Sequence, residues 1–382
     1  MGRLHLNGDR NSKGCWPSRA ETELLKAGLA WDGTALQAWS RWKSLVAWED
    51  VDFQSQRLLP LVYRNLRFHH IEDPLLPRLR GVLLKNIYQQ TLNFNRVGRL
   101  LGGFDSAGID CLLLKGAVLC LRYYGGIGTR PMEDVDLLVR KVQLPQALEI
   151  LASDRWVTKY PSALGITAVV HACPFHDRSG TDVDLHWNVI EASDDPHLED
   201  TFWQGAVPFE FAGRPRRTLS PTDLLLHVLA HGFPGNATRT LRWIPDAVLI
   251  MRAAEIDWER FCREARKRVV AARCALALAF LDEEGFQEVP EAVLRSLREH
   301  PERWFDRRYL RLSLRNPAKS GPLGMFEFLA TRSLRLARGR PLLATRVLVR
   351  MLRLAALHSG KGVLRWGLSR SFSRLSNYLP HR

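Results

Sequence analysis

Two neighbouring stretches decide the fold: Cys111-Leu-Leu-Leu-Lys-Gly-Ala-Val-Leu119 and Arg130-Pro-Met-Glu-Asp-Val-Asp-Leu-Leu-Val139. The first predicts a short buried strand, a break at a glycine and then a helix. The second predicts another strand, and this strand carries Asp134 and Asp136. Because side chains alternate along a strand, the two carboxylates lie on one face with their Cα atoms about 6.5 Å apart. Two carboxylates in this arrangement can share divalent metal.

A hairpin is expected after the aspartate strand. Two apolar runs, around 168–176 and 181–190, are joined by Asp177-Arg-Ser-Gly180, whose residues favour a turn. The second run alternates polar and apolar residues. Its polar members therefore share one face of the predicted strand: Asp182, Asp184 and His186.

Helical periodicity dominates the rest of the chain. Apolar residues recur at helical spacing over 20–103, with a break near Asp73-Pro74, and three to five helices are expected there. Ser220-Pro221 predicts the N-terminus of a later helix. The expected fold class is α+β, with a mixed sheet flanked by helical regions. Four regions are expected: a helical N-terminal region at 1–100, a catalytic domain at 101–215, a helical domain at 216–300 and a basic, mostly helical region at 301–382.

The positive charge is concentrated at the C-terminal end. The formal net charge is +15, and residues 301–382 hold 16 Arg and 2 Lys against three acidic residues, so this region accounts for the whole excess. In 340–358, Leu348, Met351, Leu352 and Ala355 form one helical stripe, and Arg346, Arg350 and Arg353 form another. Three interpretations stay open: binding of nucleic acid, binding to an anionic membrane, or packing of the apolar stripe on the body.

The cysteines and the N-terminus favour a cytoplasmic protein. Six cysteines are scattered without a CxxC pair, and several lie in apolar runs, which suits buried thiols rather than disulfides or a zinc site. The first residues contain no apolar segment typical of a signal peptide. No apolar run reaches the roughly 18 residues that a membrane-spanning helix needs.

Five motifs in order resemble one known family. They are Leu113-Leu-Lys-Gly-Ala117, Arg130 to Val139, Val183-Asp-Leu-His-Trp187, Leu219-Ser-Pro-Thr-Asp-Leu-Leu-Leu-His227, and Leu241-Arg-Trp-Ile-Pro-Asp246 with a later Asp257-Trp258. This set is similar to the uncharacterised nucleotidyltransferases, a branch of the DNA polymerase beta-like nucleotidyltransferase superfamily. The resemblance spans roughly residues 55–295.

The resemblance implies a two-metal carboxylate site. Asp134 and Asp136 would bind both metal ions, and Asp184 would complete the catalytic metal and lie near the acceptor hydroxyl. Magnesium, or manganese, suits such oxygen ligands. Asp182 lies on the same face as Asp184, and an exchange of roles between them stays open.

The nucleotide side of the site is expected around Lys115 and Gly116. The superfamily's usual Gly-Ser is Gly116-Ala117 here, so a hydroxyl contact to phosphate is absent. Lys115 is the candidate to replace it, and the equally weighted alternative is a lysine at the strand end in water. Arg130 either clamps phosphate or buttresses the aspartate loop, and the first interpretation is preferred. His186 either touches substrate or orients a carboxylate, but the sequence favours a structural histidine with its hydrogen bonds satisfied.

His227 and His231 are four residues apart on a predicted helix. They lack the glutamate of an HExxH motif, so a structural pair is expected rather than a metal site.

The expected activity is metal-dependent transfer of NMP from an NTP to an unidentified acceptor, with release of pyrophosphate. By resemblance alone, the acceptor is a peptide, a sugar phosphate or another small molecule. The alternative is a non-catalytic nucleotide-binding adaptor whose basic C-terminal region binds RNA, membrane or a protein partner.

Overall fold

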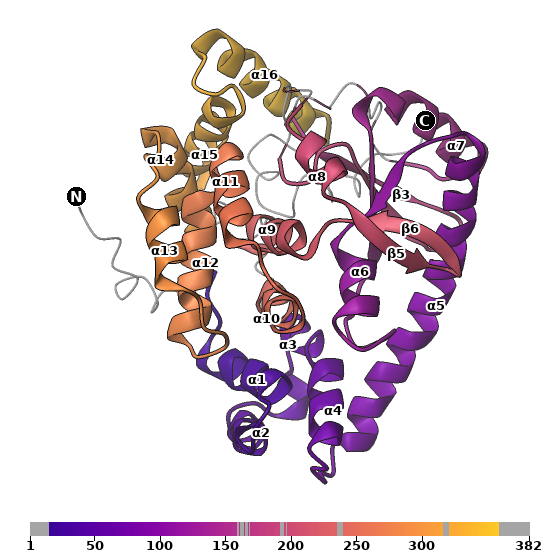
Figure 1. The fold of residues 1–382 in the computed structure, drawn as a ribbon, viewed down its shortest axis with the longest axis vertical. Helices are drawn as coiled ribbons and strands as arrows, with labels where there is room; N and C mark the ends of the chain where they lie inside the picture. Colours follow the sequence, from indigo (N-terminus) through magenta and orange to yellow (C-terminus); the bar gives the residue numbers. More distant parts are fainter. Residues whose placement is uncertain are drawn as a thin grey trace.

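The computed structural model describes residues 15–358, except for 159, 161–163, 165–166, 168, 192–194, 196, 235–239 and 316–320. Figure 1 shows a sheet on one side of the molecule, with helices around it and beside it. The six strands are β1 (Cys111–Leu113), β2 (Asp134–Val139), β3 (Ala172–His176), β4 (Asp182–His186), β5 (Val207–Phe211) and β6 (Arg214–Thr218). Their spatial order is β3-β4-β2-β1-β6-β5.

The sheet is mixed, as expected. β2 runs parallel to β4 and antiparallel to β1, and the predicted β3–β4 hairpin is antiparallel. β1 continues directly into α6 (Lys115–Arg122), and the Leu114 N–H donates to the Asp136 carbonyl oxygen at 3.0 Å. The chain therefore leaves β1 beside the aspartate strand, which sets where Lys115 begins α6.

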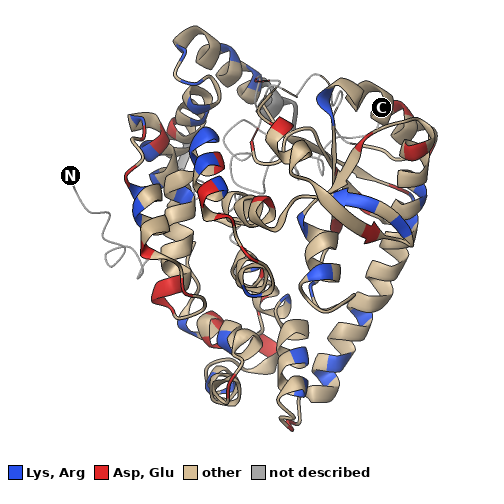
Figure 2. Cartoon of the chain, viewed as in Figure 1, with Lys and Arg blue, Asp and Glu red and all other residues tan. Residues whose placement is uncertain are grey.

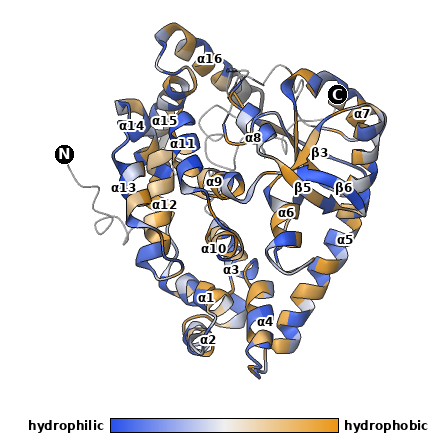
Figure 3. Ribbon diagram, in the orientation of Figure 1, coloured by the Kyte–Doolittle hydropathy of each residue, from blue (hydrophilic) through white to orange (hydrophobic). Residues whose placement is uncertain are grey.

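The β5–β6 hairpin was not expected from the sequence. Its residues have little apolar alternation, since β6 reads Arg-Pro-Arg-Arg-Thr, and Figure 3 shows hydrophilic colour along this edge of the sheet. β6 still pairs with β1 in parallel. Because β6 ends at Thr218, the sheet extends past the boundary expected at 215.

Five α-helices precede the sheet, within the expected number. They are α1 (Arg19–Leu29), α2 (Thr34–Leu45), α3 (Phe53–Gln56), α4 (Leu59–Phe68) and α5 (Leu76–Ser106). The break between α4 and α5 contains Asp73-Pro74, as predicted. α5 has 31 residues and runs along the sheet (Figure 1), so it crosses the boundary expected at 100.

In the described part of the chain, α7 and α8 join α6 as helices between strands, and the first five helices after the sheet are α9 to α13. They are α7 (Leu144–Ser153), α8 (Asp200–Gln204), α9 (Pro221–Gly232), α10 (Trp243–Ala253), α11 (Trp258–Lys267), α12 (Ala271–Glu283) and α13 (Glu291–Arg298). Ser220 caps α9 as expected, because its side chain accepts from the Asp223 N–H. α9 and α12 are buried along most of their length, and Figure 3 shows α12 largely in apolar colours.

Three helices form the C-terminal part: α14 (Trp304–Leu314), α15 (Gly321–Leu336) and α16 (Pro341–His358). Their Leu329, Val347 and Met351 belong to the common hydrophobic core, while Arg346 and Arg350 are exposed. Figure 2 shows Lys and Arg distributed over these helices. Part of the apolar stripe is thus buried, since Met351 lies in this core against α15, and Leu348 and Leu352 are partly buried beside it. Binding of nucleic acid or membrane stays a prediction, and residues 359–382 lie outside the described part.

Among the described residues, no helix is both long enough and apolar enough to cross a membrane. The described cysteines are all free thiols, and five of the six are buried.

Candidate active site

The centre of the site lies where β2 and β4 run side by side. The parallel register pairs Asp134 with Asp182 and Asp136 with Asp184, so the two aspartate strands present their carboxylates in adjacent rows. Asp136 is 1% exposed and Asp184 is 7% exposed. Asp134, at the start of β2, is half-buried, and Asp182 is exposed. Of the two candidates on β4, Asp184 is therefore the one beside Asp136 in the interior.

Two cationic side chains contact these carboxylates. Lys115 Nζ lies 3.0 Å from Asp136 Oδ1. His186 Nε2 lies 3.2 Å from the same oxygen and 3.5 Å from Asp184 Oδ2. The other ring nitrogen of His186 is 3.4 Å from the Asn188 carbonyl oxygen, so both nitrogens face acceptors. In the metal-free protein, His186 thus bridges the two aspartate strands.

Gly116 allows the backbone of α6 to approach the aspartates closely. A Cβ atom at this position would lie 3.1 Å from Met132 Cε and 3.5 Å from Asp136 Oδ2. Gly116 thus lies next to the Asp136 carboxylate, and a side chain at this position would press first on the end of Met132.

Burial and neighbouring charges raise the pKa of Asp134 and lower that of Asp136. Burial, together with the charges of Asp136 and Asp184, raises the pKa of Asp134 to about 6. Burial alone would raise the pKa of Asp136 as well, but Lys115 and His186 outweigh it and hold that pKa well below its usual value. Burial would lower the pKa of His186, but its hydrogen bonds to Asp136 and Asp184 raise it to about 9.

A divalent metal ion fits this donor set. Ligand atoms of Asp136, Asp184 and His186 all lie within 4.8 Å of one another. Asp184 Oδ1 is buried and has no hydrogen-bond partner among the described residues, although a buried carboxylate oxygen normally has one. Of the expected metal ligands, Asp136 and Asp184 belong to this compact group, whereas Asp134 stands just outside it at the end of the strand.

Comparison with known proteins identifies the family of the chain. The profile of a family described as uncharacterised nucleotidyltransferase matches residues 42–300, which is about two thirds of the chain. The chain belongs to this family. The crystal structure of an antigenic nucleotidyltransferase-like protein from Paracoccidioides brasiliensis is also similar, with 17% identity and a TM-score of 0.34, covering 55% of this chain and 94% of that one. No curated protein matches the chain.

In this nucleotidyltransferase family member, Arg130 has a structural partner. Its Nε and Nη2 atoms donate to the two carboxylate oxygens of Asp246 on α10, both at 2.7 Å. The Tyr124 hydroxyl donates to Asp246 Oδ1 at 2.6 Å. Arg130 is only 5% exposed. This arrangement corresponds to the buttress interpretation of Arg130 and not to the preferred phosphate clamp, because the guanidinium already holds a carboxylate.

A second arginine, Arg242, belongs to the same motif as Asp246 and lies near Asp134. Arg242, which precedes α10, donates from Nη1 to the Pro131 carbonyl oxygen at 2.7 Å. Its Nε is buried without a hydrogen-bond partner among the described residues. Burial, with the charges of Arg130 and Arg57, lowers the pKa of Arg242 to about 9. The sequence shows the motif that contains Arg242 but does not reveal that Arg242 lies near Asp134, because only the folded chain brings α10 to the loop before β2.

His227 and His231 on α9 lie closer to the aspartate site than expected. His231 Nε2 lies 3.4 Å from Lys115 Nζ, and the ring of His227 is 6.4 Å from that of His186. His171, which the sequence did not single out, has its ring 5.3 Å from His186. Among the described residues, the group of ligand atoms close enough together to hold a metal ion contains Asp136, Asp184 and His186 but neither His227 nor His231, and the structural interpretation of the pair stays a prediction.

Proposed function

We propose that the protein transfers NMP from an NTP to an acceptor, with release of pyrophosphate, in a metal-dependent reaction. The observation that carries this proposal is the in-register placement of Asp136 and Asp184 on neighbouring strands, together with a buried oxygen of Asp184 that has no hydrogen-bond partner in the described part of the chain. Membership of the nucleotidyltransferase family supports the same reaction class.

Asp136 and Asp184 would hold Mg²⁺ or Mn²⁺, with Asp134 as a further ligand at the open end of β2. When bound, such ions stabilise the negative charge on the entering and leaving oxygens of an in-line displacement. The acceptor oxygen forms a bond to the α-phosphorus, the bond from that phosphorus to the β-phosphate oxygen breaks, and pyrophosphate leaves. Asp184 is the candidate to accept the proton of the acceptor group.

Cations of the chain surround the same carboxylates and would bind the nucleotide phosphates. Lys115 reaches Asp136 from the first turn of α6, and Arg242 stands beside Asp134 with donor capacity to spare. Gly116 keeps the start of the α6 backbone close to the Asp136 carboxylate. Arg130 would position the β2 loop through Asp246, and His186 would orient Asp136 and Asp184.

The test is direct transfer of label. The full-length protein is incubated with each α-³²P-labelled NTP, Mg²⁺ or Mn²⁺, and candidate acceptors that include peptides and sugar phosphates. We expect label on one acceptor class together with pyrophosphate, and no label with Asp136→Asn. Nucleotide binding without any transfer, across all NTPs and both metals, would contradict this proposal and favour a nucleotide-binding adaptor.

A further inference from the structure

The outward face of α16 carries apolar residues that the body does not cover. Leu342 is 83% exposed and Val349 is 40% exposed. They are seven residues apart, so they lie two turns apart on one side of the helix. The opposite side packs inward, because Val347 and Met351 are buried in the common core. α16 therefore has one apolar side against the body and another on which two apolar side chains meet solvent.

Exposed arginines lie among these apolar residues. Arg346 is four residues from both Leu342 and Arg350, so the three share one side of the helix. Both arginines are exposed, and in the part of the chain that the structure describes neither guanidinium has an ion pair or a hydrogen bond. This surface is called the α16 face, and it consists of Leu342, Arg346, Val349 and Arg350.

Arginines that lie nearer the body are paired with carboxylates. Arg335 Nη1 lies 3.0 Å from Asp306 Oδ1, and Arg338 Nη2 lies 3.2 Å from Asp195 Oδ2. After Glu327, however, the sequence contains 11 Arg and one Lys but no acidic residue. Figure 2 accordingly shows basic but no acidic residues along α16. The α16 face thus belongs to a part of the chain whose positive charge is not balanced locally.

A lipid surface with anionic phospholipids matches both kinds of side chain on the α16 face. Guanidinium groups bind phosphates, and the negative potential of an anionic leaflet attracts them. Apolar side chains leave water when they enter the boundary between headgroups and acyl chains. A nucleic acid would use the arginines alone, because most of its contacts are made through phosphates. Leu342 and Val349 therefore favour the lipid surface.

A second copy of the chain fits the α16 face less well. A two-fold contact through this face would bring the same surface of both copies together, so arginines would meet arginines. Like charges placed opposite one another in an interface are unfavourable. The α16 face therefore calls for a partner with negative charge.

The position and length of α16 suit contact with an extended surface. Figure 1 shows α16 at the end of the molecule opposite α1–α4. Its 18 residues make a helix about 27 Å long. The sequence that follows continues the same chemistry, since residues 359–382 contain four Arg and one Lys together with Trp366, Phe372 and Tyr378. Aromatic residues of this kind favour the interface between water and lipid.

We propose that the α16 face binds peripherally to membranes that contain anionic phospholipids. Arg346 and Arg350 contact lipid phosphates, while Leu342 and Val349 enter the headgroup boundary. This binding is separate from the proposed nucleotidyl transfer, because none of these residues belongs to the aspartate site. α16 also lies beyond residues 42–300, so the match to the family does not account for this face.

The test is co-sedimentation of the full-length protein with phosphatidylcholine vesicles, prepared with or without phosphatidylglycerol. We expect binding only to the anionic vesicles, and weaker binding as salt is added. Each arginine near an anionic leaflet contributes about fivefold to the affinity, so Arg346→Gln combined with Arg350→Gln should lower it at least tenfold. The control is Arg80→Gln combined with Arg99→Gln on α5, which removes two exposed charges elsewhere and should leave the affinity within twofold.

Leu342→Ser tests the apolar contribution, because it changes no charge. We expect it to weaken vesicle binding at least threefold, with the Tm of the protein unchanged since Leu342 is exposed. Vesicle binding that is absent from the wild type, or that the paired Arg346 and Arg350 substitutions leave unchanged, would overturn the proposal. A short single-stranded RNA is the competing probe. RNA binding that depends on both arginines, with vesicle binding indifferent to Leu342→Ser, would overturn it in favour of nucleic acid.

Discussion

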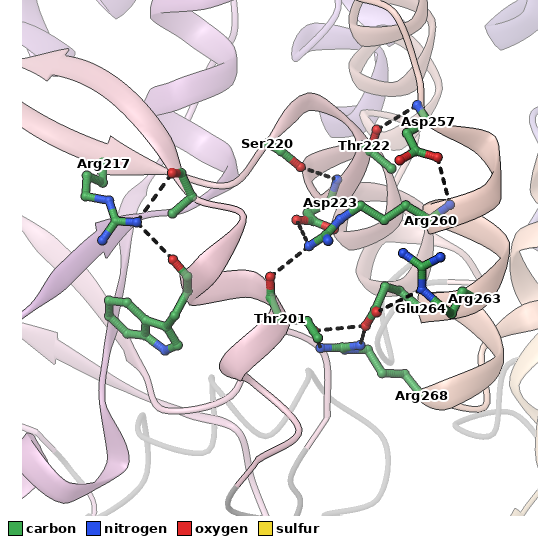
Figure 4. Close-up of polar contacts among 12 residues, drawn as sticks. Thr201, Arg217, Ser220, Thr222, Asp223, Asp257, Arg260, Arg263, Glu264 and Arg268 are labelled. Atoms are coloured by element: carbon green, nitrogen blue, oxygen red, sulfur yellow. Dashed lines mark hydrogen bonds and ion pairs between the residues drawn. The ribbon is translucent and has the colours of Figure 1, made fainter.

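Two buried charged regions of the molecule differ in whether arginines hold their carboxylates or leave a carboxylate oxygen without a partner. The first joins α8, α9 and α11 (Figure 4). There Arg260 donates to both carboxylate oxygens of Asp223, at 2.9 and 2.8 Å, and to the Thr201 carbonyl oxygen at 2.7 Å. Glu264 accepts from Thr201 Oγ1 at 2.9 Å and from Arg268. Each carboxylate in this network has at least one arginine beside it.

The aspartate site is built in the opposite way. Asp134, Asp136 and Asp184 share Lys115 and His186, and one oxygen of Asp184 has no partner among the described residues. The first region holds helices together, because arginines fix both of its carboxylates in place. The second leaves a buried oxygen of the Asp184 carboxylate without a hydrogen-bond partner among the described residues, so a cation bound there would stabilise the site. The following predictions test this contrast.

The largest effect is expected for Asp184→Asn. Loss of one charged ligand oxygen should remove about 4 kcal/mol of transition-state stabilisation, so transfer should fall about a thousandfold. Asp182→Asn, two residues earlier on the same strand but exposed, is the matched control and should stay within about threefold of the wild type. Steady-state transfer of labelled NMP measures both, and equal losses in the two variants would contradict the assignment of Asp184.

The paired network should respond in stability rather than in activity. Asp223→Ala leaves Arg260 without its carboxylate, and removing one partner of a buried pair destabilises by about 3 kcal/mol. Thermal unfolding should show a lower Tm, while NTP binding per folded molecule stays unchanged. A loss of NTP affinity at unchanged Tm would mean that this network also serves the active site.

Asp134→Asn should stabilise the metal-free protein. The folded pKa of Asp134 is raised to about 6, so its ionised form is disfavoured in the folded state. Neutralising it should raise the free energy of unfolding at pH 7 by about 1–2 kcal/mol. Since the pKa is raised above its unfolded value near 4, the stability of the wild type in EDTA should decrease as the pH rises from about 4 to 6. Denaturant unfolding of both forms checks this, and a lower stability of the variant would contradict it.

His186 should affect stability at higher pH. Its folded pKa of about 9 exceeds the unfolded value near 6.5, so its contribution is fully present below about pH 6.5 and is lost as the pH rises through about 9. The Tm of the metal-free wild type should therefore fall over this range more steeply than that of His186→Gln. Parallel Tm profiles for the two proteins would contradict the bridging imidazolium.

Much of the catalytic core follows from local sequence. The alternation in β2 and β4 placed Asp134, Asp136, Asp184 and His186 on common faces, and a strand followed by Lys115-Gly116 fixed the start of α6. These features depend on neighbouring residues along one strand or turn. The β5–β6 hairpin lacked such a signal, because its stability depends on pairing with β1.

The partners of the arginines and histidines could not be read from the sequence. Arg130 was expected to prefer phosphate, but a helix more than one hundred residues later brings Asp246 to it. The same helix brings Arg242 to Asp134, and α9 brings His231 to Lys115. Such contacts are set by the packing of whole helices, so spacing within a motif does not reveal them.

Metal binding tests the central claim most directly. Mn²⁺ is titrated calorimetrically into the metal-free wild type, Asp182→Asn, Asp136→Asn and Asp184→Asn. A metal site at Asp136 and Asp184 predicts saturable Mn²⁺ binding by the wild type and Asp182→Asn. It also predicts that Asp136→Asn and Asp184→Asn lose at least tenfold in Mn²⁺ affinity. Mn²⁺ binding that is unchanged by Asp136→Asn and Asp184→Asn, or absent from the wild type, would contradict it.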